Sequence, residues 1–287
     1  AKFGLDYTSL AHDNPGLVYC SITGFGQDGP YAPRAGYDFM IQGMAGVMDL
    51  TGEPDGQPQK MGVAFADIFT GLYSVIAIQA ALAMRARSGR GQHVEIAMLD
   101  SLIAMQGYLS QIYLVTGETP QPVGTRHPSI VPYQAFEASD GYVILAIGND
   151  GQFTRFCEVA DLQGLATDDR FATNPERVRN RATLIPILHG VMSGRSMDRW
   201  IETLNAAHVP VGPINDLERV FNDPHIQARG MQTAPVAADG ALLQGVASPL
   251  KLSQTPPITP KAAPDLGADT LAVLTQLLDP NEFDIKA

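Results

Sequence analysis

Cysteine is scarce in this sequence, whose 287 residues include only Cys20 and Cys157. Neither belongs to a CxxC pair and the sequence has no histidine cluster, so it predicts neither a disulfide framework nor a metal site. Basic residues are also few, because 19 Lys and Arg stand against 30 Asp and Glu and leave a net charge of −11. This balance argues against a nucleic-acid partner, whose phosphates require a basic surface.

Long apolar runs are lacking as well. No uninterrupted run reaches the length needed to span a bilayer and no signal peptide precedes the first segment, so we expect a cytoplasmic protein without a membrane partner. The composition of 45% hydrophobic and 17% charged residues suits one large core or two smaller ones. The sequence opens with AKFGLDY, without Met, and soon enters strand-like sequence. We therefore expect an upstream portion to be missing.

The first part of the chain alternates predicted strands and helices. Short apolar strands are predicted at 17–22 and 92–97, with a helix over 67–89 between them. A second long helix is predicted over 98–117, where a glycine ends the pattern. This order predicts an α/β layer built on largely parallel strands.

The second part begins with a hairpin pattern. Residues 133–136 and 142–147 are β-formers on either side of the turn sequence Ser139-Asp140-Gly141. Helical sequence follows to about residue 205, and a final helix is predicted over about 270–278.

These patterns predict a division into two domains. Residues 1–117 and 223–287 form a large α/β domain, and residues 130–222 form a smaller α+β domain. Residues 118–129 contain three prolines and no periodicity, which is typical of a linker.

Asp67 immediately precedes an apolar run with helical spacing. The free N–H groups and the positive dipole end of a helix start stabilise a carboxylate as an anion. Two interpretations are open on this pattern alone. Asp67 is either an N-cap, the commoner role, or a carboxylate nucleophile, which has to be ionised at neutral pH.

Several segments together resemble family III CoA-transferases, the superfamily of formyl-CoA transferase and α-methylacyl-CoA racemase. They are NPGLVYCSITGFGQDGPYAPRAGYDFMIQGMAG, ADIFTG, GRGQHVEIAMLDS, GNDGQF and VPVGPINDLERVFNDPHIQARGM, in unbroken order. The resemblance covers essentially the whole chain. SIVPYQAF, DGY and GN-x-x-QF are most similar to the succinyl-CoA:glutarate CoA-transferase branch.

The resemblance implies roles for particular residues. Asp67, in ADIFTG, matches the catalytic nucleophile, which would carry CoA as an aspartyl-CoA thioester. CoA-binding contacts are implied at Lys2, Ala35, Gly36, Tyr37, Asp38 and Met98. A glycine-rich flap over the substrate is implied at Gly148, Asn149, Asp150, Gly151 and Gln152.

Some of these positions have a simpler interpretation. Residues 148–152 are typical of a strand-to-helix turn capped by Asn149 or Asp150. Met98 at a strand end is more often a core residue than a ligand contact. His127, beside Arg126, is a further candidate for binding a substrate's second carboxylate, although a solvated linker histidine explains it as well.

The resemblance also implies a fold and an activity. The fold is a Rossmann-like doubly wound layer with a smaller α+β domain, in a family of interlocked homodimers. The activity is CoA transfer from an acyl-CoA such as succinyl-CoA to a (di)carboxylic acid, with coenzyme A as a substrate and no tightly bound cofactor.

Three alternatives stay open: an acyl-CoA racemase, a carnitine-type CoA-transferase, and a non-catalytic fragment that needs its N-terminal part. Racemases of the superfamily have a histidine base where this chain has Tyr37. Racemisation is disfavoured because a tyrosine keeps its proton near neutral pH.

Overall fold

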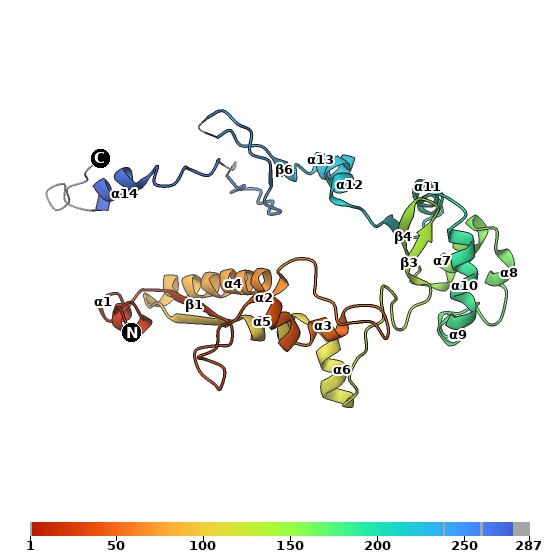
Figure 1. Cartoon of the computed structure of the whole chain (residues 1–287), viewed down its shortest axis with the longest axis horizontal. Coiled ribbons are helices and arrows are strands. Elements are labelled where there is room, and N and C mark those ends of the chain that lie inside the picture. Colours follow the sequence, from red (N-terminus) through yellow and green to blue (C-terminus); the bar gives the residue numbers. More distant parts are fainter. Residues whose placement is uncertain (1, 238, 259–260, 278–287) are drawn as a thin grey trace. The chain divides into compact units, whose positions relative to one another are not determined.

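The computed structural model describes residues 2–237, 239–258 and 261–277 (Figure 1). It divides into two compact units, Ala1–Gly212 and Pro213–Ala287. The finer division that the sequence predicts, at 118–129 and after 222, stays a prediction.

A parallel pair of strands organises the start of the first unit. Its elements up to residue 116 are α1 (Tyr7–Asp13), β1 (Tyr19–Thr23), α2 (Asp38–Met44), α3 (Val47–Leu50), α4 (Phe65–Ser88), β2 (His93–Ala97), α5 (Met98–Met105) and α6 (Tyr108–Thr116). Strands β1 and β2 run parallel, with Tyr19 opposite His93 and Thr23 opposite Ala97. The predicted α/β class is confirmed.

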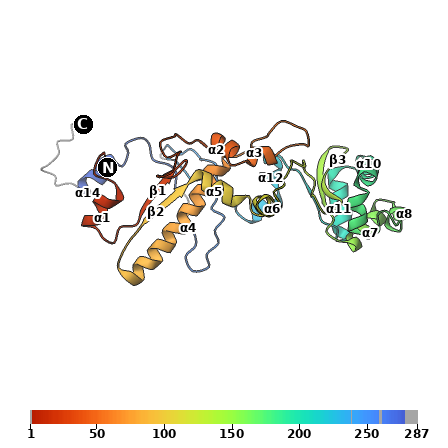
Figure 2. The ribbon, with the colours of Figure 1, turned by 90° about the horizontal axis from the view of Figure 1, so that it is seen from below.

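Helix α4 packs along this sheet and against α2 and α5 (Figure 2). Its buried face consists of small residues at helical spacing: Ala66, Thr70, Ser74 and Ala81. Thr70 Oγ1 and Ser74 Oγ donate to carbonyls one turn earlier, at 2.6 and 2.7 Å, so the buried hydroxyls are satisfied inside the helix. The helix ends, as predicted, at Gly89, whose left-handed φ of 71° allows its N–H to reach the Arg85 carbonyl.

The outer face of α4 is apolar. Ile68, Leu72, Val75 and Ile76 are between 50% and 63% exposed. In the described part of the chain, α4 is the one helix that is long and apolar enough to cross a membrane, a test that core helices of soluble proteins also pass. No such run is evident in the sequence because polar residues interrupt it. The absence of a membrane partner stays a prediction.

The helix predicted over 98–117 is not continuous. Helix α5 ends at Met105 and α6 begins at Tyr108, and Gly107 between them has φ 57° and ψ −122°. This conformation is open to glycine but strained for residues with a Cβ. Gln106 donates from Nε2 to the Ala45 carbonyl after α2, so a tertiary contact fixes the break. The prediction of one helix was wrong because an isolated glycine does not interrupt the apolar pattern.

A three-stranded sheet covered by helices completes the first unit. Its elements are β3 (Tyr133–Ala138), β4 (Gly141–Ala146), α7 (Asp150–Val159), α8 (Gln163–Ala166), α9 (Asn174–Arg179), α10 (Arg181–Met192), α11 (Met197–Ala206) and β5 (Val211–Pro213), with sheet order β3-β4-β5. The predicted hairpin is confirmed, since Tyr133 lies opposite Ala146 and Ala138 opposite Gly141. Val143 and Leu145 on one face of β4 are buried, as the period of a strand requires.

Arg177 is fully buried inside this part of the unit. Its guanidinium donates to the Val131 carbonyl at 2.7 Å, to the Phe171 carbonyl at 2.9 Å and to Asp150 Oδ1 at 2.7 Å. It also lies 4.4 Å from the centre of the Phe153 ring. One side chain therefore joins the approach to β3, the loop before α9 and the first turn of α7.

The two cysteines are free thiols. Cys157 is fully buried, and this burial raises the pKa of its thiol to about 12. The thiol stays protonated at neutral pH and is unreactive as a nucleophile. Among the described residues, no group of three or more His, Cys, Asp or Glu side chains could hold a metal ion.

The second unit consists of short elements. They are α12 (Leu217–Asn222), α13 (Pro224–Ala228), β6 (Gln232–Thr233), β7 (Gly245–Val246) and α14 (Thr270–Leu277). Asp216 and Asp223 cap α12 and α13 by accepting backbone N–H bonds, both at 2.8 Å. Helix α14 confirms the predicted final helix as far as residue 277, and residue 278 lies outside the described residues.

Candidate active site

Asp67 lies in the first turn of α4, not at its cap. The helix begins at Phe65, and its N-cap residue, Ala64, has no side-chain bond to offer. Asp67 is exposed, and within the described ranges no hydrogen bond or ion pair engages its carboxylate. The N-cap interpretation is therefore wrong, while the charge argument still holds, because free N–H groups and the dipole act throughout the first turn.

The cap of α4 comes instead from Asp38, a position where the sequence predicted a CoA contact. Asp38 Oδ1 accepts from the Ala66 N–H at 2.8 Å, and its Oδ2 accepts from Gln42 Nε2 at 2.7 Å. Gln42 is fully buried, and its Oε1 accepts from the Met61 N–H at 2.9 Å. The segment before α2 is thus bonded to the helix that carries Asp67.

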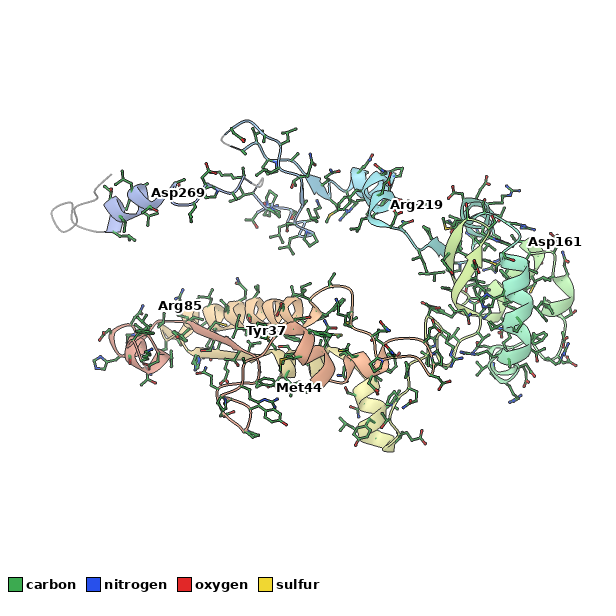
Figure 3. The ribbon with its side chains drawn as sticks, in the orientation of Figure 1. Tyr37, Met44, Arg85, Asp161, Arg219 and Asp269 are labelled. Carbon is green, nitrogen blue, oxygen red and sulfur yellow. The ribbon has the colours of Figure 1, made fainter. Side chains whose placement is uncertain are left out.

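The residues that precede Asp38 also lie near the start of α4. Tyr37 is the N-cap residue of α2 and leaves 72% of its surface exposed, as Figure 3 shows. Ala35 is also exposed. Gly36 has a structural reason of its own, since a Cβ there would lie 2.5 Å from the Gly24 Cα. The structure therefore places residues 35–38 together near the start of α4.

Met98 and Lys2 are placed differently. Met98 starts α5, is 8% exposed and packs in one core cluster with Ile41 and Leu102. Lys2 precedes α1, and the turn after α1 is bonded to the last turn of α4 through Arg85, whose Nη1 donates to the Gly16 carbonyl at 3.2 Å (Figure 3). About 27 Å of helix separates Arg85 from Asp67 at 1.5 Å per residue. The structure does not bring Lys2 to Asp67.

The turn at 148–152 is capped by its own side chains, in an arrangement one residue wider than a capping box. Asn149 Oδ1 accepts from the Gln152 N–H at 2.9 Å, and Gln152 Oε1 accepts from the Gly148 N–H at 2.7 Å. Asp150 is bonded to the buried Arg177, as described above. The local interpretation as a capped turn is confirmed. No hydrogen bond among the described residues joins this turn to the first turn of α4, and its role as a flap stays a prediction.

His127 is held against the start of β3. Its N–H donates to the Tyr133 carbonyl at 2.8 Å, and its Nδ1 accepts from the Ser129 N–H at 3.2 Å. The second half of the predicted linker is thus hydrogen-bonded to the sheet. Its neighbour Arg126, and not His127, lines a cavity.

Asp38, Gln42 and Arg177 hold these segments together, a role that was not predicted from the sequence. Asp38 and Gln42 are four residues apart on one helix, a spacing that predicts a side-chain pair. That signal was available in the sequence. Arg177 lies in the charged stretch ERVRNR, which is typical of a solvated helix face, and no local signal indicates its burial.

The chain belongs to CoA-transferase family III, whose model matches residues 1–270. It is therefore a chain of a transferase family, in agreement with the resemblance found in its sequence motifs.

Two individual relatives match most of this chain. Succinate–glutarate CoA-transferase of Agrobacterium fabrum is 48% identical over 277 residues, which are 96% of this chain and 69% of that protein. Human succinyl-CoA:glutarate CoA-transferase is 38% identical over 231 residues, which are 80% of this chain and 53% of that protein. This chain thus spans about half to two thirds of the length of these relatives.

A solved structure supports the fold. The crystal structure of a CAIB/BAIF family protein from Brucella suis is 50% identical and superposes with a TM-score of 0.87. The match covers 96% of this chain and 72% of that one.

Proposed function

We propose that this chain carries the nucleophilic aspartate of an enzyme that moves CoA from an acyl-CoA, such as succinyl-CoA, to a (di)carboxylic acid. The observation that carries the proposal is the 48% identity to succinate–glutarate CoA-transferase over 96% of the chain. The exposed carboxylate of Asp67 in the first turn of α4 supports it. Because the relatives are longer, the activity is proposed for the protein that contains this chain.

The proposed chemistry is covalent catalysis by a carboxylate. Asp67 attacks the thioester carbonyl of the donor, which forms a mixed anhydride and releases CoA thiolate. The thiolate then attacks the aspartyl carbonyl, so that the donor acid leaves and an aspartyl-CoA thioester remains. The acceptor carboxylate attacks this thioester in turn, and the released thiolate attacks the acceptor carbonyl of the new anhydride. Asp67 is regenerated and acceptor acyl-CoA leaves.

The same proposal covers the surroundings of Asp67. Residues 35–38 contact CoA beside the start of α4, and the turn at 148–152 closes over the intermediates to exclude water. Lys2 and the 8% of Met98 that is exposed contact CoA at other points along its length. The protein acts in the cytoplasm as an interlocked homodimer, with no tightly bound cofactor.

The test is to trap the intermediate. After incubation with succinyl-CoA, hydroxylamine should cleave an acyl or CoA adduct and leave a hydroxamate. Peptide mass should place this hydroxamate on Asp67. A 2-methylacyl-CoA in deuterated water should gain no α-deuterium, since one face lacks a base near pH 7. Rapid α-exchange without an adduct would contradict the proposal and favour a racemase. The absence of both signals would favour a non-catalytic fragment. A longer form of the protein should then restore the activity.

We predict that valine at Gly148 or Gly151 lowers turnover far more than stability. A Cβ at Gly148 would meet no atom nearer than 3.6 Å, and one at Gly151 none nearer than 3.5 Å, so both positions have room. A closing loop, by contrast, needs backbone freedom that a β-branched residue removes. The measurements are kcat and the melting temperature, with Gly164→Val as a control glycine in α8 that also has space around it. Variants that melt several degrees lower yet keep full turnover would show that the turn is only structural.

A further inference from the structure

A cavity of about 570 Å³ lies between the end of the linker and helices α9 and α10. Its lining includes Arg126, Arg179 and Arg181 from these segments and Glu53 from the loop before α4. No residue of the first turn of α4 lines it, so it is separate from the site proposed above.

Among the described residues, two of the three arginines have no ion-pair partner. Arg179 is paired with Glu176 on its own helix. Arg181 donates from Nη2 to the His127 carbonyl at 2.7 Å and to the Pro128 carbonyl at 3.1 Å, neutral groups that fix its position without cancelling its charge. For Arg126, no hydrogen bond or ion pair engages the guanidinium anywhere in the described part of the chain.

These two cations repel each other. Partial burial and the nearby Arg126 charge lower the pKa of Arg181. An anion placed between two like charges removes this repulsion, and the planar guanidinium fork suits the two oxygens of an oxyanion.

Glu53 limits how much negative charge the cavity can accept. The Gly124 N–H donates to the Gly52 carbonyl at 2.8 Å, which holds the Glu53 loop against the linker. The Glu53 carboxylate packs so closely on Gly124 that a Cβ there would lie 2.7 Å from Oε2. Arg126 and Arg181 against the Glu53 carboxylate leave a net charge of +1, which suits one carboxylate group between the arginines better than a phosphate, which carries up to two charges on a single group.

The rest of the lining suits a carbon chain. Val123, Ile185 and Pro186 line the cavity beside the arginines. A pocket with apolar walls and a few charged groups is typical of small-molecule sites, and its volume lies in their range.

We propose that this cavity is a second binding site, for the carboxylate of a small organic acid. Arg126 and Arg181 hold the carboxylate, and the apolar wall contacts its carbon chain. The proposal goes beyond CoA transfer at Asp67 and does not depend on it.

The test is calorimetric titration of the full chain with glutarate, its neutral diamide and inorganic phosphate. Glutarate should bind, the diamide should not, and phosphate should bind more weakly. Arg126→Gln should weaken glutarate binding at least tenfold, because it removes a cation that holds no other group. In the protein that contains this chain, Arg126→Gln should leave kcat for CoA transfer at Asp67 unchanged, which separates this site from the catalytic one.

Two further variants control for folding and for net charge. Arg199→Gln removes an exposed arginine paired with Glu202 on α11, away from the cavity, and should leave binding unchanged. Glu53→Gln removes the competing carboxylate and should tighten glutarate binding severalfold, an effect that damage to the fold would not produce. Glutarate binding that is absent from the parent, or unchanged by Arg126→Gln and Glu53→Gln, would overturn the proposal. Phosphate binding tighter than glutarate would overturn the assignment to a carboxylate.

Discussion

Replacing Asp67 by asparagine should lower kcat for CoA transfer by more than about a thousandfold, as loss of a covalent nucleophile does in other enzymes. The amide keeps the shape of the side chain but cannot attack a thioester carbonyl. Folding should be unaffected, because Asp67 is exposed and α4 is capped by Asp38 instead. Transfer from succinyl-CoA to glutarate, followed by chromatography of the CoA esters, measures the effect in the protein that contains this chain.

Asp49→Asn is the matched control. Asp49 is also an exposed acid in a first helical turn, that of α3, so the substitution removes the same charge from the same type of position. It should leave turnover within about twofold of the parent, since surface changes away from a site have small effects. Transfer by Asp67→Asn within tenfold of the parent would remove Asp67 from its assigned role.

Replacing Arg177 by methionine should lower the free energy of unfolding by about 2–5 kcal/mol, because each buried carbonyl left without a donor costs about 1–3 kcal/mol, whereas the ion-pair partner Asp150 is half exposed. Methionine fills much of the same space but donates no hydrogen bond. The carbonyls of Val131 and Phe171 then lose their partner inside the core. Urea unfolding reports the change directly, because the single tryptophan, Trp200, lies buried in the same core.

Arg170→Met gives the comparison. Arg170 is paired with Asp168 at 2.7 Å, but at the surface, where an ion pair contributes little to stability. Its urea midpoint should stay close to that of the parent. If the two variants unfold at the same urea concentration, Arg177 does not hold the three segments together.

Local patterns were sufficient to predict much of the fold. The strands at 19–23 and 93–97, the hairpin and the last helix follow from apolar spacing and from turn residues within a few positions. The break at Gly107 could not be predicted in this way, because the neighbouring Gln106 binds the Ala45 carbonyl, 61 residues earlier in the chain. The start of α4 was misplaced for a similar reason, since its cap, Asp38, is 28 residues away from Ala66.

The candidate site, too, could be predicted only where local patterns indicate it. Spacing placed Asp67 at a helix start, and only the resemblance to a family gave it a chemical role. Arg177 was missed because the groups that justify its burial, such as the Val131 carbonyl 46 residues earlier, come from distant segments. The paired cations at Arg126 and Arg181 were missed because 54 residues separate Arg181 from the linker carbonyl that it binds at His127.

The bonds from Asp38 and Gln42 have a practical consequence for anyone who remodels this protein. They bind the backbone N–H groups of Ala66 and Met61, so the segment that leads into α4 is fixed on α2. The turn-rich stretch 51–58 takes no part in these bonds. Loop length costs little conformational entropy, so residues could be inserted there, or a reporter sequence grafted, without moving the carboxylate of Asp67.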